Sequence, residues 1–219
     1  MKRLIQHMQT YSVLFLLFVF TGLIFLFMTD KVQAHLSINA QHSVFQDSVF
    51  PWVTYLGDGR FVGVIALFAS LPFLKNKKFL SAVVFGAITL FLVAVIIAVA
   101  KQLIFPDAFR PWKYLTEVAH VEFYRIPGVE MHTNQSFPSG HTAAAFGLFG
   151  YVAFMYAKNR IVQVACAVAA ILVGYSRIYL NQHFLEDVVA GAIVGTACMV
   201  IAYFITRAIK FKNNVARID

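Results

Sequence analysis

Apolar runs of roughly 20 residues recur along the chain and are separated by short polar stretches. Their approximate bounds are residues 11–28, 59–74, 79–104, 139–157, 161–180 and 187–205. A helix of about 20 apolar residues matches the thickness of the hydrocarbon layer of a bilayer. The pattern therefore predicts an all-α fold, an integral-membrane bundle of six transmembrane helices. The second run is the shortest, and the apolar segment 42–55 before it is a candidate for the membrane interface.

The N-terminal segment shares features with a signal peptide. Lys2 and Arg3 precede the first apolar run, and residues 32–34 loosely resemble a signal-peptidase site. The run is longer than the apolar region of an ordinary signal peptide, so we interpret it as a retained first helix. Since no repeat or low-complexity tract divides the sequence, we expect one transmembrane domain over residues 1–219.

Basic residues follow alternate runs, which predicts the orientation of the chain. The clusters are Lys2 and Arg3; Lys75, Lys77 and Lys78; Lys158 and Arg160; and Arg207, Lys210, Lys212 and Arg217. With six spans, all four clusters fall on one side, which the positive-inside rule makes cytoplasmic. We therefore expect a multi-pass protein of a bacterial-type cell membrane with both termini in the cytoplasm. The longest external connection is then the loop 105–137, which is rich in proline and aromatic residues.

Composition supports this interpretation. Sixty per cent of the residues are apolar and only 13% are charged, which is atypical of a soluble protein. The formal charge of +8 would suit nucleic acid, but the basic residues form clusters between apolar runs rather than a stripe. We expect the membrane as a partner, no nucleic acid, and no obligatory protein partner. Cys166 and Cys198 lie within apolar runs and are expected to pack as small apolar side chains.

Ionisable residues from separate segments lie at the external ends of the apolar runs in this topology. They are Lys101, His141, Arg177, His183 and Asp187. Ionisable side chains near membrane spans are costly and often mark functional sites. The topology alone therefore predicts a functional site on the outer face.

His183 and Asp187 are four residues apart, a spacing that places two side chains on one face of a helix. The carboxylate can accept the proton of one imidazole nitrogen and leave the other as a nucleophile or base. Taken alone, the spacing is a weak signal and favours a chance or structural arrangement.

Residues 138–141, Pro-Ser-Gly-His, predict a turn that opens a helix. The Ser139 hydroxyl and the Gly140 amide would then face an anion at the positive end of the helix. The alternative is a plain N-cap in which Ser139 only satisfies free backbone amides. His141 has no part in such a cap and is a candidate acid.

Arg110 and Arg177 carry guanidinium groups suited to bidentate contact with phosphate, although each could also be an interfacial arginine. Together with Lys101 they favour a phosphate-like ligand. The external side lacks a pair of acidic residues at metal-binding spacing, so we expect a metal-independent site without a cofactor. The other histidines are interpreted as interface or loop residues: His7, His35, His42, His120 and His132.

Two further features have structural interpretations. Asp58, between two glycines, is expected to be the N-cap of the second apolar helix and is given no catalytic role. Gly191 and Gly195 form a face of small residues in the last run, which is typical of close helix packing.

These motifs resemble those of the type-2 phosphatidic acid phosphatase superfamily. Its second motif, Pro-Ser-Gly-His, matches residues 138–141, and its third, Ser-Arg-x5-His-x3-Asp, matches Ser176, Arg177, His183 and Asp187 at full spacing. The first motif, Lys-x6-Arg-Pro, departs, because eight residues separate Lys101 from Arg110. Two extra residues rotate a helical side chain by about 200°. Lys101 therefore reaches the phosphate only if the chain absorbs the insertion, and Lys113 is the alternative lysine of this motif.

The resemblance implies a lipid-phosphate phosphatase in which His183, oriented by Asp187, forms a phosphohistidine while His141 protonates the leaving group. It also implies phosphate contacts from Arg110, Arg177, Lys101, Ser139 and Gly140. The first-choice substrate is phosphatidylglycerophosphate, and the alternative is undecaprenyl pyrophosphate. A transporter of anionic lipid would instead place its ionisable groups at the membrane midplane, and a non-catalytic scaffold would be expected to lack a member of the histidine and aspartate set.

Overall fold

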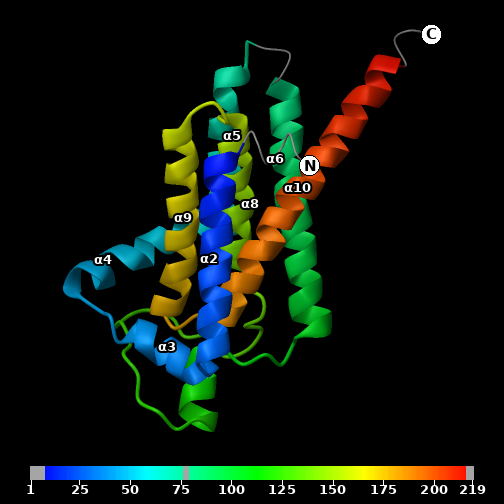
Figure 1. Cartoon of the computed structure of the whole chain (residues 1–219). Coiled ribbons are helices and arrows are strands. Elements are labelled where there is room, and N and C mark those ends of the chain that lie inside the picture. The colour runs from blue at the N-terminus through cyan, green and yellow to red at the C-terminus, as the bar shows by residue number, and fades with distance from the viewer. Residues whose placement is uncertain (1–7, 76–78, 216–219) are drawn as a thin grey trace.

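The computed structural model describes residues 8–75 and 79–215, with side chains as far as residue 209. In this part of the chain every regular element is a helix, as the apolar pattern predicts. The long helices lie roughly alongside one another (Figure 1) and are α2 (Gln9–Met28), α5 (Gly59–Ser70), α6 (Phe79–Val99), α8 (Gly140–Met155), α9 (Arg160–Tyr179) and α10 (Leu185–Val215).

Four of the described helices are long and apolar enough to cross a membrane: α2, α6 with its continuation to Ile104, α9, and α10 as far as Ile209. A fifth candidate is the pair Val44–Gly57 and Gly59–Phe73, which is bent by 68°. The helix α8 has 16 residues, fewer than the roughly 20 that a bilayer requires. The structure therefore shows a helical protein with four or five candidate spans, and the prediction of six spans is not confirmed.

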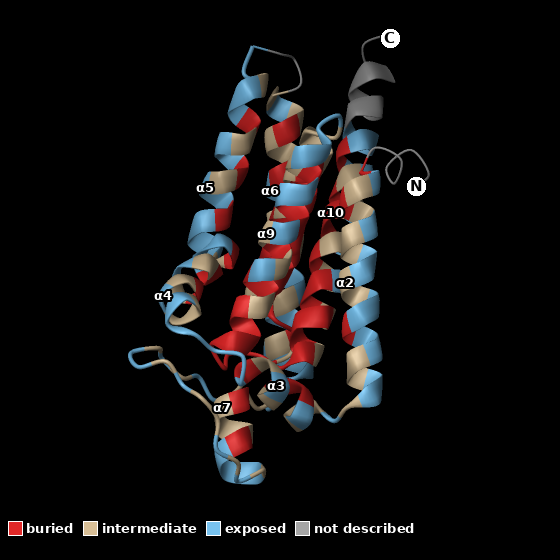
Figure 2. Ribbon diagram, turned by 60° about the vertical axis from the view of Figure 1, so that its left-hand side comes forward, coloured by how far each residue is buried: buried red, intermediate tan, exposed pale blue. Residues whose placement is uncertain are grey.

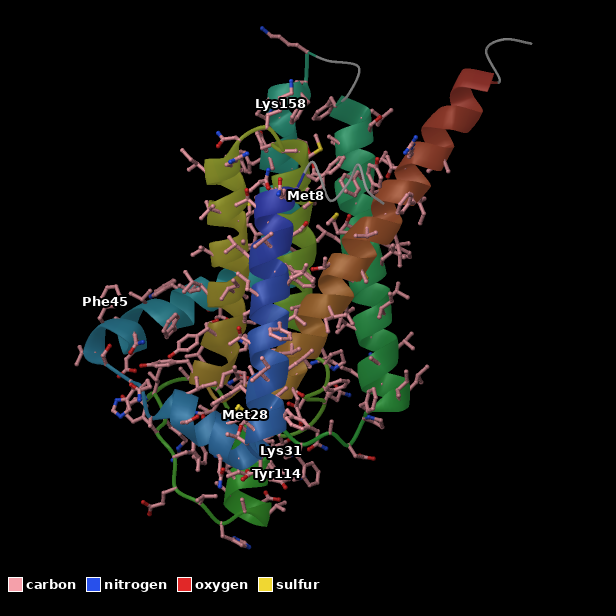
Figure 3. All side chains as sticks on the ribbon, in the orientation of Figure 1. Met8, Met28, Lys31, Phe45, Tyr114 and Lys158 are labelled. Atoms are coloured by element: carbon pink, nitrogen blue, oxygen red, sulfur yellow. The ribbon has the colours of Figure 1, made fainter. Side chains whose placement is uncertain are left out.

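The described basic clusters lie at one end of the bundle. The beginning of α2 and Lys158 are at this end, whereas Met28 and Lys31 are at the other (Figure 3). Arg160 is the first residue of α9 and lines the same cavity as Lys158, which lies in the turn before this helix. Other members of the clusters lie outside the described residues or side chains: Lys2, Arg3, Lys77, Lys78, Lys210, Lys212 and Arg217.

The small residues of α10 allow it to pack closely against α8. A Cβ atom added to Gly195 would lie 2.1 Å from the carbonyl oxygen of Ala143, and one added to Gly191 would lie 2.5 Å from that of Ser139. This contact confirms the predicted small-residue face and sets the spacing between two helices that carry site residues. α8 is largely buried at the centre of the bundle (Figure 2), and both Cys166 and Cys198 are free, buried thiols.

Shorter elements cover the end of the bundle opposite Lys158. They are α3 (Lys31–Asn39), α4 (Val44–Val53), η1 (Thr54–Gly57), η3 (Ala100–Ile104), α7 (Pro111–Lys113) and η4 (Tyr114–Val118), while η2 (Leu71–Phe73) extends α5. The helix α4 projects sideways from the bundle (Figure 1). Its apolar side chains Val44, Phe45 and Trp52 are 85%, 74% and 73% exposed, as expected of a segment in contact with lipid.

Candidate active site

The predicted site residues come together at the end of the bundle that carries α3 and α7. His141 is in the first turn of α8, Arg177 in the last turn of α9, and Asp187 in the first turn of α10. His183 lies in the connection between α9 and α10. The backbone amide of Ser139 donates to the carbonyl of Asp187 at 2.9 Å, which ties the starts of α8 and α10 together.

His183 is fully enclosed and faces Asp187. Its Nδ1 lies 3.4 Å from Oδ2 of Asp187, and the side chain is 1% exposed. The same carboxylate oxygen accepts hydrogen bonds from the Ser136 hydroxyl at 2.5 Å and from the Phe184 amide at 2.9 Å. The carboxylate is thus held in place by two donors, and it can orient the imidazole.

The connection that carries His183 is anchored to the end of α9. The backbone amides of Gln182 and His183 both donate to the carbonyl of Arg177, at 2.9 and 3.1 Å. Asn181 adopts a left-handed conformation with φ of 55°, which asparagine tolerates better than most residues. These contacts give the nucleophile candidate a defined position.

Burial lowers the pKa of His183 well below its usual value, and the cations of Arg110, Arg177 and Lys101 lower it further. The imidazole is therefore neutral at neutral pH, which is the form that a nucleophile requires. The three cations among the predicted phosphate ligands thus all act electrostatically on His183.

Arg177 is 6% exposed and donates from Nη1 to the Thr54 hydroxyl at 2.6 Å. Its Nε is buried and has no hydrogen-bond partner among the residues that the structure describes. A buried donor without a partner is costly. The geometry therefore favours an external anion beside Arg177 rather than an interfacial arginine.

Arg110 is held at the site from the opposite side. Its Nε donates to the carbonyl of Asn134 at 3.0 Å, and Nη1 donates to the Gln182 carbonyl and Oε1 at 3.1 and 3.3 Å. Burial lowers the pKa of Arg110. These backbone and amide contacts fix the guanidinium next to the connection that carries His183.

Lys101 reaches the site despite the longer first motif. The end of α6 widens into a π-helix at η3, where the Phe105 amide donates to the carbonyl of Ala100 at 2.8 Å. A π-turn accommodates an extra residue in a helix and so absorbs part of the insertion. Nζ of Lys101 donates to the Gln135 carbonyl at 2.8 Å, whereas Lys113 lies over the Phe109 ring, 4.2 Å from its centroid.

Ser139 caps α8, as one of the two interpretations of its motif predicts. Its hydroxyl accepts from the Thr142 amide at 3.4 Å and lies 2.8 Å from the Thr142 hydroxyl. The residue is fully buried, and Gly140 follows at the first position of the helix. The free amides at this helix end remain suited to an anion.

A polar cavity of about 390 Å³ opens beside His141 and Arg177. Its other polar lining residues include Thr54, Asp58, Glu130, His132 and Gln182. Asp58 caps α5 by accepting from the Arg60 amide at 2.9 Å, which confirms its predicted structural role. The cavity provides space for a ligand next to the histidine that was predicted to act as an acid.

Sequence reasoning missed several residues that hold this site. Ser136, Thr54 and Gln182 carry no motif, and only the folded chain brings them to Asp187, Arg177 and Arg110. His35 was expected at the interface or in a loop, but it is completely buried in α3. Its Nε2 lies 2.8 Å from Oδ1 of Asn181, because α3 folds back beneath the connection that carries His183.

Comparison with known families agrees with the motifs. Residues 81–211, more than half of the chain, match the model of the PAP2 superfamily. The chain belongs to the PAP2 superfamily. The predicted family is thereby confirmed, and the match includes both helices that begin with site residues, α8 and α10.

Individual PAP2 relatives are lipid phosphatases by name. Phosphatidylglycerophosphatase B of Bacillus subtilis is 37% identical over 68 residues, which cover 27% of this chain and 34% of that protein. Lipid A 1-phosphatase of Rhizobium etli is 34% identical over 61 residues, covering 28% of this chain and 25% of the relative. The matched segments thus span about a third or less of these relatives.

Two solved structures resemble most of the chain. LpxE of Aquifex aeolicus has a TM-score of 0.63 and 26% identity, over 78% of this chain and 93% of that one. The PAP2-type phosphatidylglycerolphosphate phosphatase of Bacillus subtilis has a TM-score of 0.54 and 24% identity, over 91% and 97% of the two chains. The second likeness concerns the fold alone.

Proposed function

We propose that this chain is a membrane lipid-phosphate phosphatase that converts phosphatidylglycerophosphate to phosphatidylglycerol and inorganic phosphate. The observation that carries the proposal is the buried pair of His183 and Asp187, surrounded by Arg110, Arg177 and Lys101 at one end of a helical bundle. A neutral, oriented imidazole among three cations suits in-line attack on a phosphate monoester.

In the first step, His183 attacks phosphorus. Because Nδ1 faces Asp187, Nε2 is the nitrogen that forms the bond to phosphorus. The bond from phosphorus to the lipid oxygen breaks, and protonated His141 gives its proton to that oxygen. The products of this step are a free lipid alcohol and a phosphohistidine.

In the second step, water hydrolyses the phosphohistidine. His141, now neutral, takes a proton from water as the oxygen attacks phosphorus and the bond to His183 breaks. Inorganic phosphate leaves, and the enzyme returns to its starting state. Each turnover thus consumes one water and needs no further reactant.

Cations and helix-end donors stabilise the charge on the transferring phosphoryl group, which is usually the largest contribution in such reactions. We assign this role to Arg110, Arg177, Lys101, the Ser139 hydroxyl and the Gly140 amide. The unpartnered Nε of buried Arg177 supports this assignment, since a phosphate oxygen would satisfy it. Neutral side chains and backbone carbonyls hold the three cations in place. The proposed reaction is metal-independent.

We place the site on the outer face of a bacterial-type cell membrane, with both termini in the cytoplasm. The support is that Lys158 and Arg160 lie at the end of the bundle opposite His183. A lipid would then move sideways to the site while its acyl chains remain in the bilayer. No protein partner is part of the proposal.

Two other lipid phosphates are candidates for the same chemistry. Undecaprenyl pyrophosphate presents a terminal phosphate on a long tail, and lipid A 1-phosphate is favoured by the likeness to the lipid A 1-phosphatase of Rhizobium etli. A non-catalytic transporter of anionic lipid is disfavoured, because the described charged site residues gather at one end of the bundle rather than at its middle.

The test is phosphate release by purified protein in detergent, with chelator, from phosphatidylglycerophosphate, undecaprenyl pyrophosphate and lipid A 1-phosphate in parallel. We expect the fastest release from phosphatidylglycerophosphate, with no loss on chelation. His183→Ala should abolish release and the trapping of an acid-labile phosphoenzyme. Release that survives His183→Ala would refute the assignment of the nucleophile, and faster release from another lipid would refute the choice of substrate.

A further inference from the structure

The segment between α4 and α5 is locked against the start of α8. A Cβ atom on Gly57 would lie only 2.4 Å from the carbonyl oxygen of His141, so a side chain at this position is excluded. Three residues earlier, the Thr54 hydroxyl accepts from Arg177 at 2.6 Å. The backbone that leads into Asp58 is therefore positioned by the site itself, although it belongs to the bent helix pair.

The carboxylate of Asp58 has two different neighbours. Oδ1 accepts from the Arg60 amide at 2.9 Å and from Arg60 Nε at 3.2 Å. Oδ2 lies 3.5 Å from Arg60 Nη2 and 3.9 Å from Nε2 of His141, on the wall of the polar cavity. The Asp58 side chain is only 16% exposed, whereas that of Arg60 is 84% exposed. One oxygen thus caps α5 while the other is directed at the histidine.

The charges around His141 make this carboxylate important. Burial lowers the pKa of His141 to about 3, and the cations Arg177, Lys101 and Arg110 contribute to the lowering because they oppose a positive charge on its ring. His183 is a further close neighbour, and His132 and Glu130 lie on the wall of the same cavity. Among the groups that act on His141, Asp58 is the anion that favours the protonated ring.

We propose that Asp58 is a positioning residue that orients His141 and stabilises its protonated form as the acid of the first step. The proposal rests on the proposed function, because it presupposes that His141 protonates the departing lipid oxygen. Asp58 itself neither gains nor loses a proton. The proton moves from the His141 imidazolium to the oxygen as its bond to phosphorus breaks, and Asp58 stabilises the imidazolium beforehand.

The test is Asp58→Asn, which removes the charge but retains the cap, because asparagine caps helices as well as aspartate does. Single-turnover release of the alcohol is measured for a lipid phosphate and for p-nitrophenyl phosphate. The lipid leaves as an alkoxide and needs a proton, whereas p-nitrophenolate does not. We expect release from the lipid phosphate to fall about 10–100-fold and release from p-nitrophenyl phosphate to stay within about twofold.

The pH profile gives a second readout. An acid acts only when it is protonated, so the rate with lipid falls as pH rises through the pKa of that acid. Loss of the Asp58 charge disfavours protonation of His141, and the alkaline limb should move to lower pH in Asp58→Asn. Arg60→Gln is the matched control, since it removes the other partner of the carboxylate at an exposed position and should leave both rates within about twofold.

Each other outcome has a distinct meaning. Equal losses with both substrates, or no loss with either, would overturn the role of Asp58 while leaving the proposed function intact. Absence of lipid-phosphate hydrolysis in the unmodified protein would instead refute the proposed function and the role of Asp58 with it.

Discussion

The contact between α8 and α10 predicts a large effect from a single methyl group. In Gly195→Ala, the new Cβ would lie 2.1 Å from the carbonyl oxygen of Ala143, whereas such atoms repel each other below about 3.0 Å. The helices must therefore separate by about 0.9 Å at this point. Alanine favours a helix over glycine by about 1 kcal/mol, but overpacking of a backbone contact costs about 1–3 kcal/mol.

The same movement should reach the site. Asp187 begins α10 and His141 begins α8, and the hydrogen bond between Ser139 and Asp187 joins the two helices there. Misplacement of catalytic groups by about 1 Å can cost on the order of 10²-fold in rate. We expect Gly195→Ala to lower phosphate release about 10–100-fold. The net cost in stability is about 0–2 kcal/mol, so the midpoint of thermal unfolding should fall by up to about 8 °C.

The assay is thermal unfolding in detergent together with phosphate release from a lipid phosphate. Gly63→Ala in α5 is the matched control, because nothing lies within 4 Å of a Cβ at this position. There the helix propensity acts alone, so this variant should unfold at the same temperature as the unmodified protein or slightly above it. If Gly195→Ala behaved like Gly63→Ala, the close packing of α8 and α10 would be refuted as the origin of the site's geometry.

Three further predictions concern separate parts of the molecule. Arg110→Gln removes a cation that lowers the pKa of His183, so the pKa should rise and the acidic limb of the pH–rate profile should move to higher pH. His35→Leu leaves buried Oδ1 of Asn181 without its donor, so the free energy of unfolding measured by chemical denaturation should fall by about 1–3 kcal/mol. His35→Gln keeps a donor and should restore part of the lost free energy. In a variant whose remaining tryptophan is Trp52, lipids with brominated acyl chains should quench the fluorescence, because this side chain of α4 is exposed. Fluorescence that is not quenched would contradict lipid contact by α4.

Part of the site was predictable from the sequence because its residues lie near helix ends. His141, Arg177 and Asp187 each fall within one turn of a helix terminus, and apolar runs locate those termini well. The spacing of His183 from Asp187 is local and survives in the structure as a contact of 3.4 Å. Such short-range information needs no knowledge of the fold.

Other contacts depend on tertiary structure and have no local signal. Ser136 holds Asp187 across 51 residues, and nothing in its own sequence neighbourhood marks it as a partner. Asp58 shows the limit clearly, since its cap was predictable from adjacent residues but its approach to His141 was not. The position of Lys101 was equally inaccessible, because a π-turn is decided by packing rather than by residue spacing.

The count of six spans is not confirmed at two places, the 16-residue helix α8 and the bend after Gly57, and the bend shows why. Hydropathy measures how apolar a segment is, but it does not report the direction in which the segment runs. The apolar stretch from α4 to α5 contains enough residues to cross a bilayer, yet its two halves differ in direction by 68°. The expected apolar segments are therefore present among the described helices, but only four or five of them qualify as candidate spans.

The bend also has a consequence for the surrounding membrane. The 12 residues of α5 and the three of η2 together rise about 24 Å, short of a hydrocarbon layer of about 30 Å, and α4, which precedes them, runs in a different direction. On this flank the bundle is therefore shorter than the hydrocarbon layer is thick. A bilayer accommodates an apolar segment shorter than its hydrocarbon layer by thinning locally, and we expect such thinning beside the exposed apolar side chains of α4. We therefore expect lipid headgroups to lie closer to His141 on this flank than elsewhere around the bundle.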